Sequence, residues 1–342
     1  MTTRATLHRA AVPAAVAGIA AVLALAACSG KAPTSAPGPA TTTTASTTAT
    51  ATPSVTPTAL VPLRGGPVLA VKIDNTPSAR PRIGLNQAVV VYVEPVEGGL
   101  TRLLAVFSSH VPAEVGPVRS ARESDVELLA NYGRVALAYS GGSAYTVRVL
   151  AKGNQINLSN DASRVGFHRD SSRPAPYNVI GETKTLLARA GGSARPKDVG
   201  FRFGPASPGG VAATSVAARW PASRVTLAWN AGRKQYLVTT DGKPDLGADT
   251  VQHGASTVVV QYVRTHMSGN RDVNGRPTPV VELTGSGKVT VLRGGRAWQG
   301  TWARRSATAP TTLVSRGKPL ALAPGGPVWV LLIAPGQSVQ VR

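Results

Sequence analysis

The sequence predicts an α+β fold, in which an N-terminal α/β domain with a mixed sheet is followed by a mostly antiparallel, β-rich C-terminal domain. Short apolar runs alternate with helix-like segments between residues 67 and 190. Beyond residue 223 the pattern is β throughout. Between the two patterns lies a stretch rich in Gly, Pro, Ala and Ser, residues 193–223, which indicates an inter-domain connection.

The first half is expected to contain four strands and three helices. The strands are β-branched or apolar runs bounded by Gly, Pro and Asn, at residues 68–73, 88–93, 100–107 and 134–139. Ser120 and Glu123 fit a capping box that would begin the first helix, and Gly133 is placed to end it. Two further helices are expected over residues 144–152 and 179–190.

The second half is expected to be built from short strands. They are predicted at residues 224–229, 235–240, 257–264, 279–284, 288–293, 299–303 and 328–333. Residues 230–232 and 285–287 have the composition of hairpin connectors, which favours antiparallel pairing. All five tryptophans lie in this half, and Trp298 and Trp302 would share one face of a strand, where they fill a core or stack on sugar rings.

Residues 1–28 have the three parts of an export signal: a basic start, an apolar run and a small-residue end. The apolar run is interrupted by Pro13 and is shorter than the roughly 20 residues that a spanning helix needs. Its last four residues, Leu25 to Cys28, resemble the lipobox of bacterial lipoproteins, which implies that Cys28 carries the lipid. The alternative is an ordinary cleavage site with an incidental cysteine.

Residues 29–62 are expected to form a disordered Ala/Thr/Pro linker. Of the thirty residues from Lys31 to Leu60, 26 are Ala, Pro, Ser or Thr. Such a segment has almost no large apolar side chains whose burial would offset the entropy lost on ordering. We therefore expect a tether between the membrane and two folded domains, residues 63–200 and 201–342.

The chain is strongly basic, with 37 Lys and Arg against 16 Asp and Glu and a formal charge of +21. A field of this sign attracts anions, and an exported location disfavours nucleic acid as the partner. The single cysteine excludes an intramolecular disulfide framework. His253 and His266 lack clustered carboxylates, so no metal is predicted, and no cofactor is expected.

Four long segments carry a family resemblance. They read AVKIDNTPSARPRIGLNQAVVVYVEPVEGGLTRLLAVF, VGPVRSARESDVELL, FHRDSSRPAPYN and GSGKVTVLRGGRAWQGTWARRS. Together they resemble the YerB-like lipoproteins, a domain-of-unknown-function family of Gram-positive cell envelopes with N- and C-terminal family domains. The resemblance covers residues 65–340 and departs most around residues 241–255. It implies a membrane-attached envelope protein with an α/β first domain, and no established catalytic activity.

Polar residues of the first half follow the predicted strands, where the crevice beyond the carboxyl ends of an open α/β sheet binds ligands. A set of these residues would bind an anion through guanidinium groups and backbone amides. The set comprises Asp74, Asn75, Arg80, Arg82, Glu94, Glu97, Arg102, Arg119, Ser120, Arg122, Gly141, Gly142 and Ser143. The alternative is that these charges form structural ion pairs and turn hydrogen bonds.

His168, Arg169 and Asp170 complete the candidate ligand-binding residues. With the serines that follow them they hold the ingredients of nucleophilic chemistry, but neighbours on an extended chain point in alternating directions. A loop held by hydrogen bonds of Asp170 and Arg173 is the structural interpretation.

The leading hypothesis is a non-catalytic lipoprotein on the outer face of the cytoplasmic membrane that binds an anionic wall component or a wall-associated protein. One alternative is an envelope hydrolase or transferase acting on a wall polymer, with His168, Asp74 or Glu97 as acid or base. Another is a regulatory partner of a wall-synthesis complex. The enzyme requires His168, Asp74 and Glu97 within hydrogen-bond reach in one pocket.

Overall fold

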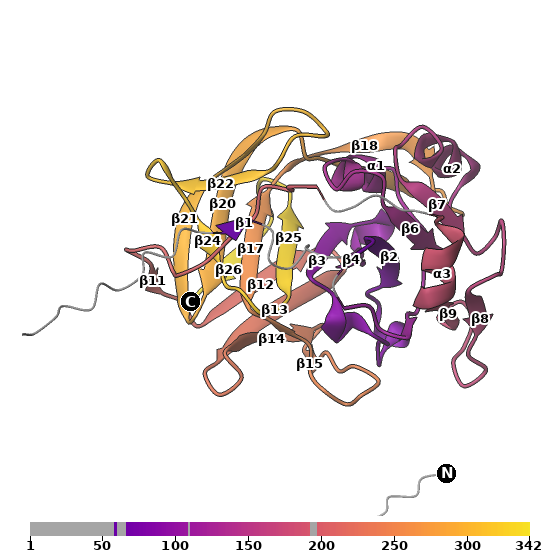
Figure 1. Ribbon diagram of the computed structural model, residues 1–342, viewed down its shortest axis with the longest axis horizontal. Coiled ribbons are helices and arrows are strands. Elements are labelled where there is room, and N and C mark those ends of the chain that lie inside the picture. Colours follow the sequence, from indigo (N-terminus) through magenta and orange to yellow (C-terminus); the bar gives the residue numbers. More distant parts are fainter. Residues whose placement is uncertain (1–57, 60–65, 109, 192–196) are drawn as a thin grey trace, which may run out of the picture. The chain divides into compact units, whose positions relative to one another are not determined.

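The computed structural model describes residues 58–59, 66–108, 110–191 and 197–342, which belong to one compact unit (Figure 1). The predicted signal peptide, Cys28 and the linker up to residue 57 lie outside the described residues, as do residues 60–65. At Thr58 and Ala59 the chain already forms a strand, so the linker predicted to end at residue 62 meets the folded unit earlier.

A twelve-stranded mixed sheet runs through both halves of the sequence. In spatial order its strands are β23 (Lys318–Pro319), β22 (Thr312–Ser315), β21 (Arg296–Arg304), β20 (Gly285–Arg293), β17 (Thr257–Tyr262), β25 (Val328–Ile333), β3 (Val90–Pro95), β4 (Thr101–Phe107), β2 (Leu69–Asp74), β6 (Ala136–Tyr139) and β7 (Ile156–Ser159), with β11 (Val211–Ala212) beside β21. Strand β25 joins the halves, because it lies parallel to β17 on one side and to β3 on the other.

The remaining strands form smaller sheets. A six-stranded sheet has the order β15 (Lys243–Pro244), β14 (Gln235–Thr240), β13 (Ser223–Asn230), β12 (Ser215–Trp220) and β26 (Val339–Val341), with β16 (Gly254–Ala255) beside β14. Strands β18 (Arg264–Arg271) and β19 (Pro277–Glu282) form a hairpin. Two three-stranded sheets contain β1 (Thr58–Ala59), β10 (Arg202–Phe203) and β24 (Ala321–Leu322), and β5 (Glu114–Val115), β9 (Val179–Glu182) and β8 (Phe167–Arg169).

Three α-helices occur in the described residues, α1 (Ser124–Ala130), α2 (Ala144–Leu150) and α3 (Thr183–Arg189), with short 3-10 helices at Pro77–Ala79, Leu85–Gln87 and Glu97–Gly99. The α+β class predicted from the sequence is confirmed. The second half is mostly antiparallel, as predicted, apart from the parallel position of β25 beside β17.

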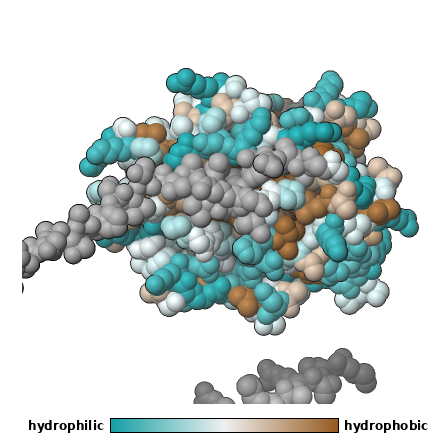
Figure 2. Space-filling view, viewed as in Figure 1, coloured by the Kyte–Doolittle hydropathy of each residue, from teal (hydrophilic) through white to brown (hydrophobic). Residues whose placement is uncertain are grey.

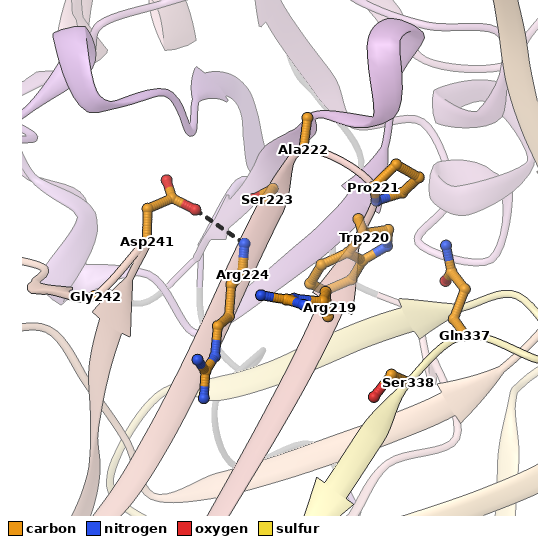
Figure 3. Close-up of a pocket in the computed structure, with 10 residues that line it drawn as sticks. All are labelled: Arg219, Trp220, Pro221, Ala222, Ser223, Arg224, Asp241, Gly242, Gln337 and Ser338. Atoms are coloured by element: carbon orange, nitrogen blue, oxygen red, sulfur yellow. Dashed lines mark hydrogen bonds between the residues drawn. The ribbon is translucent and has the colours of Figure 1, made fainter.

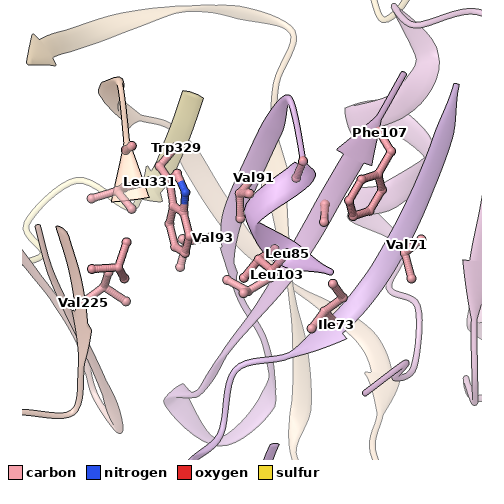
Figure 4. Close-up of a cluster of buried hydrophobic side chains, with 14 of the residues drawn as sticks. Val71, Ile73, Leu85, Val91, Val93, Leu103, Phe107, Val225, Trp329 and Leu331 are labelled. Carbon is pink, nitrogen blue, oxygen red and sulfur yellow. The ribbon is translucent and has the colours of Figure 1, made fainter. Parts of the chain in front are cut away.

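Apolar side chains bury both faces of the large sheet. On one face, Trp329 and Leu331 of β25 belong to the same core as Val225 of the six-stranded sheet (Figure 4). On the other face, Leu128 of α1 and Val281 of β19 belong to a second core. Burial of each such side chain contributes about 1.5–3 kcal/mol, so the sheet is the stable frame on which the polar strand ends are held.

The N-cap of the first helix lies three residues later than predicted, at position 123 instead of 120. This N-cap, Glu123, makes no side-chain capping bond, so the predicted capping box of Ser120 and Glu123 is wrong. The segment before α1 is held instead by long-range pairing: Arg119 donates its N–H to the carbonyl of Lys72, and its own carbonyl accepts from the N–H of Ser140. Backbone groups used between β2 and β6 are not free to form a helix.

Other predictions of local structure are also wrong, because strand pairing with distant segments determines the structure there. The expected helix over residues 179–190 is β9 followed by α3, because Val179 and Ile180 pair with β8. Residues 285–287 are the start of β20, which pairs with β21 over its full length. The stretch 193–223, predicted as an inter-domain connection, contains β10, β11 and the whole of β12. In β12 the inward positions include the small Ala218, which weakens the apolar signal of a strand.

Candidate anion-binding site

The carboxyl ends of β2, β3 and β6 lie at the same end of the large sheet, and this row of strand ends is called the strand edge below. Strand β4 is antiparallel to both β2 and β3, and β6 is parallel to β2, so these three strands run in the same direction. Asp74 and Glu94 therefore flank Arg102, the residue that opposes both of them in the register. Because opposed residues share a face, the two carboxylates and the guanidinium converge, as the sequence predicted for strand-end residues.

Arg102 is the least satisfied charge of this edge. Its side chain is 12% exposed, and its nearest carboxylate, Asp74, is 4.0 Å away. Its Nε and Nη1 atoms have no hydrogen-bond partner among the described residues. Burial, with repulsion from Arg122, lowers the pKa of Arg102 to about 9. The group stays protonated at neutral pH, so the edge holds an arginine whose charge is only partly compensated.

The carboxylate of Asp74 accepts its hydrogen bonds from donors other than Arg102. Its Oδ2 accepts from Nε of Arg119 at 2.8 Å, and its Oδ1 accepts from the backbone N–H of Thr76. Burial alone would raise the pKa of Asp74, but Arg102, Thr76 and Arg119 together lower it. The guanidinium of Arg119 also lies over the ring of Tyr177, 5.5 Å from its centroid. Asp74 is thus an ionised carboxylate that orients Arg119.

Glu97 and Arg122 form a second pair at this edge. Arg122 donates from Nε to Oε2 of Glu97 at 2.9 Å, and its Nη2 contacts the same oxygen. The other carboxylate oxygen accepts from the hydroxyl of Thr278 on β19 at 2.7 Å. Burial would raise the pKa of Glu97, but Arg122 and these hydrogen bonds lower it. The pair therefore connects the strand edge to the β18–β19 hairpin.

Lys72 and Asp125 are site neighbours that the sequence analysis missed. Lys72 Nζ lies 2.7 Å from Asp125 and also contacts Glu94, and all three side chains are buried. Burial lowers the pKa of Lys72 to about 8, although Asp125 opposes the shift. A lysine inside the apolar run 69–73 was the available signal, because an internal charge on a buried strand needs a partner.

Arg80 and Arg82 leave the strand edge and contact the second half. Arg82 is fully buried, pairs with Asp245 and donates to Oδ1 of Asn75 at 2.6 Å. Arg80 pairs with Asp241 at 3.0 Å. The contacts of Arg82 and Asn75 are therefore those of a buried ion pair and turn hydrogen bonds, which was the alternative to a ligand-binding role.

The Gly141–Ser143 turn lies beside the segment that contains Ser120, since the carbonyl of Gly141 accepts from the N–H of Ala121. Gly141 has φ +95°, and a Cβ there would lie 2.5 Å from the Ser120 hydroxyl. Ser143 is the N-cap of α2 and accepts from the N–H of Thr146 at 3.0 Å. Its hydroxyl also donates to Oδ1 of Asn270. One helix-end amide is thus capped internally, which leaves Gly142 as the exposed residue of the turn.

His168, Arg169 and Asp170 lie away from these pairs. His168 on β8 is 3.5 Å from Glu114 and 3.6 Å from Glu182. Arg169 donates to Asn178, and Asp170 accepts from Arg173, which confirms the pinned loop.

The arrangement that the enzyme hypothesis requires is absent from the described residues. Asp74 and Glu97 pair with Arg119 and Arg122, and His168 lies beside Glu114, so the three do not form one hydrogen-bonded group. A nucleophile or acid–base pair needs direct contact or one bridging water, and no such set links these three.

His253 is buried in the second half, next to the pair of Arg82 and Asp245. Its Nδ1 contacts Oδ1 of Asn86 at 2.8 Å, and its Nε2 lies 3.9 Å from Asp245. Burial lowers the pKa of His253 to about 4, so the ring is neutral near pH 7. Within the described ranges, no group of three or more His, Cys, Asp or Glu side chains is placed to hold a metal ion.

A cavity of about 740 Å³ lies where the six-stranded sheet meets the strand edge (Figure 3). The turn between β12 and β13 contacts the edge, because Ala222 donates its N–H to the carbonyl of Gly99. The Ser223 hydroxyl is 3.0 Å from that of Thr101. Two arginines that sequence analysis did not select, Arg219 and Arg224, line the cavity. They flank a Trp-Pro-Ala-Ser segment, and a hairpin there would have paired them.

The tryptophans Trp298 and Trp302 are core residues. Both are buried, and their Nε1 atoms donate to the carbonyls of Pro208 and Tyr262. On the face shown in Figure 2, hydrophilic residues cover most of the coloured surface and apolar residues form small groups. In the part of the chain with described coordinates, no helix combines the length and apolar character needed to span a bilayer.

Two family models match the chain. Residues 52–196 match the model described as "Protein of unknown function (DUF3048) N-terminal domain", and residues 216–330 match the corresponding C-terminal domain. The second match ends within β25, the strand that pairs with β3 of the first match.

A curated relative and a solved structure are similar to the chain. The relative, "Putative lipoprotein YerB" of Bacillus subtilis (strain 168), is 38% identical over 112 residues, which is 32% of this chain and 33% of the relative. The aligned part thus spans about a third of that protein's length. The crystal structure of YerB protein from Bacillus subtilis has a TM-score of 0.67 and 23% identity, covering 80% of this chain and 94% of that one.

Proposed function

Since the chain belongs to the DUF3048 family, which has both an N-terminal and a C-terminal domain, we propose that it is a lipid-anchored envelope protein that binds an anionic partner. The partner is an anionic wall component or a wall-associated protein, and the binding surface is the strand edge around Arg102. The name of the curated relative supports the lipid anchor, as does the lipobox-like sequence that ends at Cys28.

The observation that carries the binding proposal is the unsatisfied charge of Arg102. A buried charge without full compensation destabilises a fold, so its presence points to a role other than stability. Arg119, beside Asp74, adds a second guanidinium at the same edge. A carboxylate or phosphate at Arg102 would complete its hydrogen bonds, because the planar guanidinium presents paired donors to such groups.

The anchor sets where this binding takes place. An acylated Cys28 would hold the chain on the outer face of the cytoplasmic membrane, and two or more acyl chains make such attachment stable. The linker of residues 29–62 would then separate the folded unit from the lipid surface, at up to about 3.1 Å per extended residue. Replacing Cys28 with Ala should move the protein from the membrane fraction to the soluble fraction of the producing cells.

The binding proposal is tested with the full chain, extracted from native membranes and applied to purified anionic wall material. Arg102→Met keeps the length and apolar stem of the side chain and removes its charge. We expect this variant to bind about tenfold more weakly than wild type, with a thermal stability equal to or higher than that of wild type, because the incompletely compensated charge is removed. Binding of the wild type should also fall as salt is added.

The matched control is Arg233→Ala, which removes one exposed arginine from the turn between β13 and β14. It should retain wild-type binding, so that a loss in Arg102→Met is not a consequence of net charge. Equal retention of Arg102→Met and wild type across the salt series would contradict the proposal. Cross-linking of the intact protein in its membrane would identify a protein partner directly.

A further inference from the structure

We propose that the cavity lined by Arg219 and Arg224 is a second anion site, which binds the phosphate group of a sugar or polyol phosphate. It lies in the second half of the chain, on residues that are not part of the edge around Arg102. The inference therefore does not rest on the proposed function, and the two sites are tested with different variants.

The two arginines are held side by side by the β12–β13 hairpin. Arg219 and Arg224 are directly opposite each other in the register, so both side chains project from the same face of the sheet (Figure 3). Both are exposed, whereas the next pair along the hairpin, Trp220 and Ser223, is buried. Like charges directly opposite in a sheet repel each other, and an anion between them removes that repulsion.

The described residues do not supply that anion. Of the residues with described positions, Asp241 is the single acidic one that lines this cavity, and its Oδ2 pairs with Arg80. Its Oδ1 accepts from the backbone N–H of Arg224, not from the guanidinium (Figure 3). Among the described residues, neither Arg219 nor Arg224 has a carboxylate within ion-pair distance.

Residues of β26 and the ring of Trp220 adjoin the arginine pair. Arg342 donates to Oε1 of Gln340 on β26, the strand next to β12, and this glutamine lines a smaller adjoining cavity of about 250 Å³ with both arginines. Trp220 forms part of the wall, and its buried Nε1 has no hydrogen-bond partner within the described part of the chain. The site is therefore rich in donors and poor in acceptors, as anion recognition requires.

The size and charge of the site select the ligand class. Two guanidinium groups supply more donors than one carboxylate can accept, whereas a phosphate has three or four acceptor oxygens. A cavity of about 740 Å³ is within the range that accommodates a whole small molecule rather than one ion. The side chains of Gln337 and Ser338 on its rim offer hydrogen bonds to hydroxyl groups, which fits a sugar or polyol carrying the phosphate.

The test is calorimetric titration of the full chain in detergent with glycerol 3-phosphate, with inorganic phosphate and with glycerol. We expect glycerol 3-phosphate to bind more tightly than inorganic phosphate, and glycerol alone not to bind. Arg219→Ala and Arg224→Ala should each weaken binding about tenfold, and Arg224→Lys should weaken it less. Arg233→Ala and Arg102→Met should leave it unchanged.

A vesicle experiment distinguishes the source of the phosphate. If the site accepts lipid headgroups, the Arg219→Ala variant should lose added affinity for phosphatidylglycerol vesicles over phosphatidylcholine vesicles; if it accepts soluble phosphates only, wild type and variant should bind both vesicles alike. Either result supports a phosphate site when glycerol 3-phosphate binds. Absence of glycerol 3-phosphate binding, or equal affinity in Arg219→Ala, Arg224→Ala and wild type, overturns the inference.

Discussion

The strand edge of the first half and the cavity of the second half are both rich in arginine, but they differ in how the charged side chains are buried and paired. At the strand edge, Lys72 and Arg122 are buried beside carboxylates, and Arg102 lacks full compensation. In the cavity, Arg219 and Arg224 are exposed and face each other. Buried charges must be paired for the chain to fold, whereas exposed charges are free to meet a ligand.

The largest expected effect comes from removing a paired charge at the strand edge. Lys72→Ala would leave Glu94 and Asp125 buried without their cation, and we expect a loss of about 3–5 kcal/mol in the free energy of unfolding. Chemical denaturation measures it. The control, Lys152→Ala, removes an exposed lysine after α2 and should change stability by less than about 0.5 kcal/mol. Equal effects of the two variants would show that burial does not distinguish these charges.

The pH dependence of stability extends the comparison to His253, a buried group that is neutral near pH 7. The pKa of His253 is about 4 in the folded protein and about 6.5 in the unfolded chain, so between these values the unfolded chain binds more protons. Stability is therefore complete above pH 6.5 and falls as the pH drops towards 4, by about 3 kcal/mol from this residue. His253→Gln should flatten this part of the stability profile, whereas His266→Gln, an exposed control, should not.

An intermediate effect is expected at the turn after β6. Ser143→Ala removes the cap of α2 and the hydrogen bond to Asn270, which should cost about 1 kcal/mol of stability. Ser143→Thr retains a capping hydroxyl and should lose only part of this. If the alanine variant were as stable as wild type, the turn would not depend on its internal cap, and its amides would be free for a ligand.

The smallest effect on stability is expected in the cavity. Arg219→Ala and Arg224→Ala should each change the free energy of unfolding by less than about 0.5 kcal/mol, and in the stabilising direction, because each removes a like-charge repulsion. Thermal unfolding at low and high salt checks this, since screening should reduce the gain. A clear loss of stability in either variant would mean that the two arginines have stabilising partners in the fold. They would then not differ from Lys72 in their contribution to stability.

The sequence was sufficient where structure depends on local pattern. Apolar β-branched runs located β2, β3, β4 and five of the seven strands predicted for the second half within one or two residues. The polar residues that follow such runs, Asp74 and Glu94, were correctly placed near one another, because the carboxyl ends of parallel strands share an edge.

Contacts between distant segments could not be predicted in the same way. Arg82 pairs with Asp245, which is 163 residues away in the sequence. Strand β25 lies beside β3, although the paired positions Val91 and Trp329 are 329 minus 91, or 238, residues apart. The charge of Arg82 does not indicate which carboxylate it pairs with, and the apolar character of β25 does not indicate which strand lies beside it. The cavity was missed for a related reason: β12 has alanines where larger side chains would have revealed alternation, so Arg219 and Arg224 were not recognised as a hairpin pair.

The insertion of β25 between β17 and β3 has a consequence for biogenesis. Strand β25 lies far beyond β3 in the sequence, so most of the described chain must be synthesised before β3 acquires its second neighbour. Until then the first half presents an open, apolar strand edge, which is prone to associate with other chains.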